Sequence, residues 1–102
     1  MPGRQMILKT MTERLQQIKR EIDDGNLDTA ISQLNRLLTQ NSDNADYIYY
    51  LLGNAFRKQG NWQGALNNYQ EAIAINPDSP AAEAHKMVMD ILEFYNKDMF
   101  NQ

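Results

Sequence analysis

The sequence predicts an all-α protein of five antiparallel helices that stack as helical hairpins. The first observation is an internal repeat, in which Gly25 and Ala30 recur 35 residues later as Gly60 and Ala65. A period of about 34 residues is typical of stacked helix pairs. The second observation is that apolar residues recur at spacings of three and four, whereas no segment shows the sustained alternation of a β-strand. Together they predict a stack of helices without a sheet.

The length of 102 residues allows one small domain. We expect this domain over residues 6–95, after an unstructured lead at 1–5 and before a C-terminal tail at 96–102. Met6 is an alternative candidate for the native start. Because Lys9 interrupts the apolar residues that follow Met6, we expect no signal peptide. No run reaches the roughly 18 apolar residues of a membrane span.

The first hairpin is predicted over about residues 7–40. Its first helix, over 7–24, carries an apolar stripe of Met11, Leu15, Ile18 and Ile22. Gly25 follows, as glycine commonly does just past the end of a helix. The second helix carries its own apolar face and ends at the polar residues 40–44, which are rich in turn formers.

The second hairpin is predicted over about residues 45–76. Its first helix ends before Gly60, and Asn61 is expected to cap the next helix. Pro77 disfavours helix at the residue before it, so this helix should end near Ile75. Gly53 in the first of these helices and Ala65 and Ala72 in the second are small, and we expect them to let the two helices cross closely.

A fifth helix is predicted over about residues 80–95. Ser79 is placed as its N-cap and Pro80 as its first residue, where proline is well tolerated. Its main apolar stripe consists of Ala84, Val88, Ile91 and Tyr95.

Residues 45–78 resemble one tetratricopeptide repeat (TPR), a helical hairpin with a recurrent residue pattern. Several residue types match at the family's offsets: Tyr49, Leu52, Gly53, Phe56, Ala65, Tyr69 and Pro77. The first hairpin matches less well, since Leu37 replaces an alanine and Ser42 replaces the proline. The resemblance implies a short right-handed TPR-like solenoid in which the fifth helix caps the stack. It also implies a protein that binds other proteins.

In the family, the first helix of each pair lines a concave face that holds peptides. Carried over to this chain, the resemblance implies one groove, with residues from the third and fifth helices: Tyr47, Tyr50, Asn54, Arg57, Lys58, His85 and Met89. Gln16 and Arg20 would add to it from the first helix. Some members clamp the terminal carboxylate of a chaperone, but Leu51 and Ala82 stand where that clamp needs asparagine and lysine. We therefore expect a different ligand.

The sequence offers no chemistry for catalysis. Cysteine is absent and His85 is the single histidine, so we expect no catalytic residues, no metal site and no cofactor. The net charge of −3 argues against a nucleic-acid-binding protein. The absence of cysteine fits a reducing compartment, and we expect a cytoplasmic protein.

The resulting hypothesis is a non-catalytic adaptor or accessory subunit that binds a protein or peptide of unknown identity in its concave groove. Two alternatives stay open. One is a homodimer formed through exposed apolar helix faces, because residues 87–100 are apolar around much of the helix. The other is a nucleic-acid accessory factor, because residues 1–20 carry five basic side chains and one acidic side chain.

Overall fold

The computed structural model describes residues 10–40 and 43–100, and within these ranges it has five helices and no strand. The helices are α2 (Met11–Asp23), α3 (Leu27–Gln40), α4 (Ala45–Lys58), α5 (Trp62–Ile75) and α6 (Ala81–Phe100). The prediction of an all-α fold with five helices is therefore confirmed.

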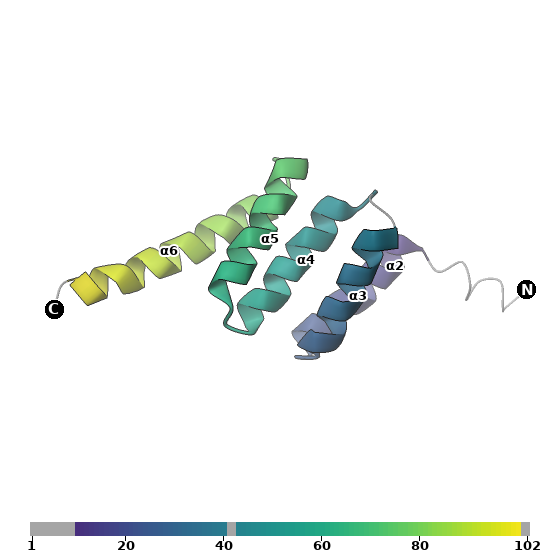
Figure 1. The fold of residues 1–102 in the computed structure, drawn as a ribbon, viewed down its shortest axis with the longest axis horizontal. Coiled ribbons are helices and arrows are strands. Elements are labelled where there is room, and N and C mark those ends of the chain that lie inside the picture. The colour runs from purple at the N-terminus through teal and green to yellow at the C-terminus, as the bar shows by residue number, and fades with distance from the viewer. Residues whose placement is uncertain (1–9, 41–42, 101–102) are drawn as a thin grey trace, which may run out of the picture.

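The helices form two hairpins in a row, α2 with α3 and α4 with α5, and α6 follows at the end of the row (Figure 1). Each helix packs against the next one along the chain, and α2 also packs against α4. Figure 1 shows that α6 leads away from the other helices toward its C-terminal end. The predicted stack of helical hairpins is confirmed.

The two hairpins turn in the same way because both carry a glycine in the left-handed region. Gly25 has φ 90° and Gly60 has φ 84°. The N–H of Asn26 donates to the carbonyl of Glu21 over 2.8 Å, and Asn61 makes the equivalent bond over 2.9 Å. This bond across six residues satisfies a carbonyl that the helix end leaves unpaired. The 35-residue repeat thus reflects two identical turns.

The other helix boundaries follow from local chemistry. The Asn61 side chain accepts a hydrogen bond from the N–H of Gly64 over 2.9 Å, which caps α5. Ser79 is buried, and its hydroxyl accepts from the N–H of Ala81 over 3.0 Å at the start of α6. The α5 helix ends at Ile75, as Pro77 predicted.

The α6 helix continues to Phe100, past residue 95 where the sequence placed its end, because neither glycine nor proline interrupts residues 81–100. The expected lead at 1–5 lies outside the described residues.

The core consists of two clusters of buried residues, one among α2, α3 and α4 and one between α5 and α6. Tyr49, Tyr50 and Phe56 of α4 pack against both clusters and so connect them. Gly53 is required at the crossing of α4 and α5, since an added Cβ would overlap the ring of the fully buried Tyr69. This rigid stack holds the first helices of the hairpins side by side.

Candidate interaction groove

A hollow of about 550 Å³ lies among α2, α4 and α6, with Trp62 at its edge. The side chains around it come almost entirely from the first helices of the pairs: Lys19, Ile22, Asp23, Leu51, Asn54, Arg57, Lys58, Met87 and Ile91. We call it the groove. The groove lies on the side of the first helices, where the TPR resemblance implied a concave face. Three of the predicted residues, Asn54, Arg57 and Lys58, line it.

The groove has three cationic side chains and one carboxylate, Asp23. The Lys58 ammonium donates to the backbone carbonyl of Asp23 over 2.7 Å, and the Arg57 guanidinium donates to the sulfur of Met87 over 3.6 Å. An ion pair outside the groove joins Lys86 and Asp90, which lie one turn apart on α6. Arg57 and Lys58 are therefore held by neutral acceptors.

Asn54 is oriented by a buried tyrosine. Its side-chain oxygen accepts a hydrogen bond from the Tyr69 hydroxyl over 2.5 Å. Burial raises the pKa of Tyr69 to about 12, although the nearby Arg57 charge opposes this shift. The hydroxyl therefore stays protonated at neutral pH and remains a donor. With its oxygen engaged, the Asn54 amide can offer its N–H groups to a ligand carbonyl.

Tyr47 and Tyr50 do not line the groove. Both are partly buried and pack against the helices around them. The ring of Tyr50 lies 5.7 Å from that of Tyr47 and 6.2 Å from that of Tyr69, measured between centroids. These distances suit tilted aromatic packing. The structure thus places both tyrosines in a ring cluster beside the α4–α5 crossing.

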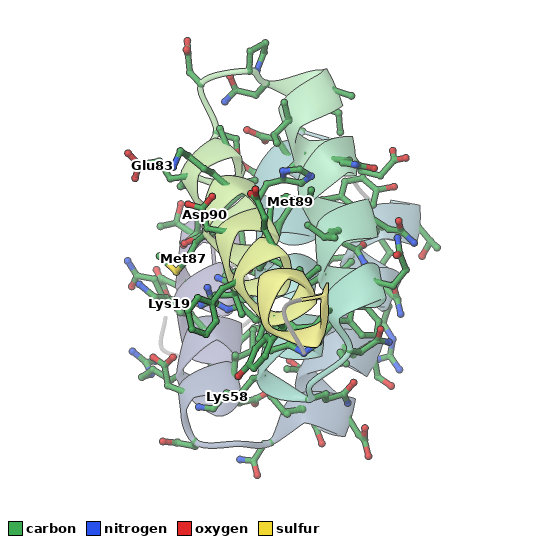
Figure 2. All side chains as sticks on the ribbon, turned by 90° about the vertical axis from the view of Figure 1, so that its left-hand side faces the viewer. Lys19, Lys58, Glu83, Met87, Met89 and Asp90 are labelled. Carbon is green, nitrogen blue, oxygen red and sulfur yellow. The ribbon has the colours of Figure 1, made fainter. Side chains whose placement is uncertain are left out.

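His85 and Met89 also lie elsewhere. The Nε2 of His85 is 3.3 Å from the Nε2 of Gln70 on α5. Figure 2 shows Met87 on the side of α6 where Lys19 and Lys58 lie, and Met89 on the opposite side. His85 and Met89 thus do not line the groove, and Met87 and Ile91 take that position instead.

The cause is the register of α6 relative to α4. The buried residues of α6 that pack against α5 correspond, at a spacing of 33 residues, to three of the α4 residues buried against the first hairpin: Ala81 with Ile48, Ala84 with Leu51, and Val88 with Ala55. The predicted residues His85 and Met89 lie 35 residues after Tyr50 and Asn54, which is the spacing of the two glycine turns. Since each helical residue turns by about 100°, a shift of two residues moves a side chain to roughly the opposite side of its helix.

A smaller shift affects α2. Gln16 and Arg20 are exposed and do not contribute to the groove, which instead takes Lys19, Ile22 and Asp23 from this helix. Trp62 is a further lining residue that the pattern of first helices did not predict, because it belongs to the first turn of α5.

Among residues 10–40 and 43–100, no group of three histidine, cysteine, aspartate or glutamate side chains is placed to hold a metal ion. No helix in these ranges is long and apolar enough to cross a membrane.

Comparison with known proteins supports the repeat. A family model described as a TPR repeat matches residues 53–82. The solution NMR structure of a Bacteroides fragilis protein is similar to this one with a TM-score of 0.80 and 56% sequence identity, over 88% of this chain and 91% of that chain. No curated protein matches the chain. The matching repeat and the stack of five helices confirm the prediction of a short TPR-like protein.

Proposed function

We propose that this chain is a non-catalytic adaptor or accessory subunit that binds a peptide or a partner helix in the groove, in the cytoplasm. The TPR repeat indicates a protein–protein interaction module. The observation that carries the proposal is the lining of the groove, where apolar side chains and hydrogen-bond donors converge from three helices. Such a mixture gives a ligand both contact area and polar contacts that fix its orientation.

The proposal extends to the predicted site residues in two ways. Asn54, Arg57 and Lys58 would contact the ligand directly, since they line the groove. Tyr50 would act indirectly, because it packs against Tyr69, which in turn holds Asn54. Tyr47, His85 and Met89 would have smaller effects on a ligand in the groove.

A peptide display library tests the proposal. Peptides selected on the wild-type protein are measured by fluorescence anisotropy against Asn54→Ala/Arg57→Ala and against Arg36→Ala. Arg36 is an exposed arginine of α3 outside the groove and serves as the control. We expect the groove variant to lose at least about tenfold in affinity, which corresponds to 1.4 kcal/mol, while the control binds like wild type. If both variants bind like wild type, the site is not in this groove.

A further inference from the structure

We infer that the partner of the groove is an amphipathic helix with acidic side chains along one flank, lying beside α6. This inference rests on the proposed function and names the class of partner that the groove fits. Three observations carry it: the neutral acceptors of the groove cations, an apolar stripe along α6, and the charges on the two sides of that stripe.

The first observation is that the groove cations can accept a stronger partner. Lys58 and Arg57 are held by a backbone carbonyl and by the sulfur of Met87, respectively. A thioether is a weak acceptor, so a ligand carboxylate would replace it with little loss. Hydrogen bonds from cations to carboxylates are shorter and stronger than those to neutral acceptors. The groove therefore favours acidic side chains.

The second observation is that the apolar wall of the groove continues beyond the stack. A second, open hollow along α6 shares Met87 and Ile91 with the groove and adds Phe94 and Tyr95. Phe94 is 63% exposed, Tyr95 59% and Met87 53%. Met87, Ile91 and Phe94 are spaced by four and three residues, so they form one stripe on the helix.

A stripe of this spacing on an exposed helix is matched by a second helix, whose ridges of side chains fit between those of the first. An extended peptide would gain less binding free energy on this surface. The described residues include no strand, so they offer no sheet edge whose backbone could pair with it. An amphipathic helix can bury its apolar face on Met87, Ile91 and Phe94 while keeping its polar face in water.

The third observation sets the orientation of the partner. On one side of the stripe lie Lys19, Arg57 and Lys58 of the stack. Glu83 and Asp90 line the outer hollow of α6, where Lys86 already pairs with Asp90 over 3.0 Å. An acidic flank of the partner would be attracted by the cations of the stack and repelled by Glu83 and Asp90 on the outer side. The acidic residues of the partner therefore face α2 and α4.

The test uses two designed helical peptides with the same leucine stripe, one with glutamate and one with lysine along the same flank. Their affinities for the full chain are measured by fluorescence anisotropy. We expect the glutamate peptide to bind about tenfold more tightly than the lysine peptide, as two well-placed charge pairs allow. Because this preference is electrostatic, it should shrink as salt concentration rises.

The decisive variant is Arg57→Glu/Lys58→Glu, which should invert the preference. The matched control is Arg14→Glu/Arg36→Glu, which makes the same change in net charge at a separate hollow between α2 and α3. It should keep the preference for the glutamate peptide. Circular dichroism checks that each variant remains folded. Equal affinities of the wild type for both peptides, or equal effects of the two double variants, would overturn the inference.

Failure of this inference differs from failure of the proposed function. If library peptides require Asn54 and Arg57 while the designed peptides show no preference, the groove binds a ligand that is not an acidic helix. If the affinity of the library peptides does not depend on Asn54 or Arg57, the proposed function fails as well. Phe94→Asp tests the apolar stripe and should lower the affinity of the chain for the glutamate peptide. If it instead converts a dimer into a monomer and leaves peptide affinity unchanged, a second copy of the chain covers the stripe and the inference is wrong.

Discussion

Gly53→Ala is the substitution that tests most directly how the helices of the second hairpin are held together. A Cβ at this position would overlap the ring of Tyr69, which is fully buried and whose hydroxyl is bonded to Asn54. Overpacking of a dense core typically costs about 1–3 kcal/mol. Alanine also favours the helical backbone over glycine by roughly 0.5–1 kcal/mol, so we expect a net destabilisation of about 1–2 kcal/mol.

The measurement is the free energy of unfolding from urea denaturation followed by circular dichroism. For a domain of this size, each 1 kcal/mol lowers the melting temperature by roughly 4–8 °C. Glu71→Ala is the control, since this exposed side chain of α5 should change stability by no more than about 0.5 kcal/mol. Tyr69→Leu removes most of the ring, so Gly53→Ala should cost less in that background than in the wild type. A Gly53→Ala protein more stable than wild type would refute the reasoning, because helix propensity alone would then explain the effect.

Two further predictions concern a helix cap and pH. Asn61→Ala removes the hydrogen bond to the Gly64 N–H and should destabilise the protein by about 1 kcal/mol in urea denaturation, whereas Asn35→Ala on the exposed face of α3 should not. Since the pKa of Tyr69 is raised to about 12 from its ordinary value of 10.0, the unfolded state loses this proton more readily than the folded state. Stability should therefore be intact below pH 10 and fall as pH rises from 10 toward 12. Tyr69→Phe should show a shallower fall over this range, and an unchanged slope would contradict the assignment.

The α4 part of the groove could be predicted from sequence, because it follows from the family pattern. Gly53 fixes which face of α4 meets Tyr69 of α5, and Asn54, Arg57 and Lys58 line the groove. The α6 part could not be predicted in the same way. Its register depends on Ala81 and Ala84 packing against α5, and two alanines give a weak signal before their burial is known.

The sequence by itself determined the number of helices, their turns and the character of the repeat. These features are local: the left-handed glycines, the Asn61 and Ser79 caps and Pro77 act within a few residues of their positions. The tertiary structure decided which side of α6 faces the groove and how far its apolar stripe extends beyond the stack. The physical reason is that a helix turns by about 100° per residue. A difference of two residues in the spacing between corresponding positions of α4 and α6 therefore leaves the helix itself unchanged but places Met87 rather than Met89 at the groove.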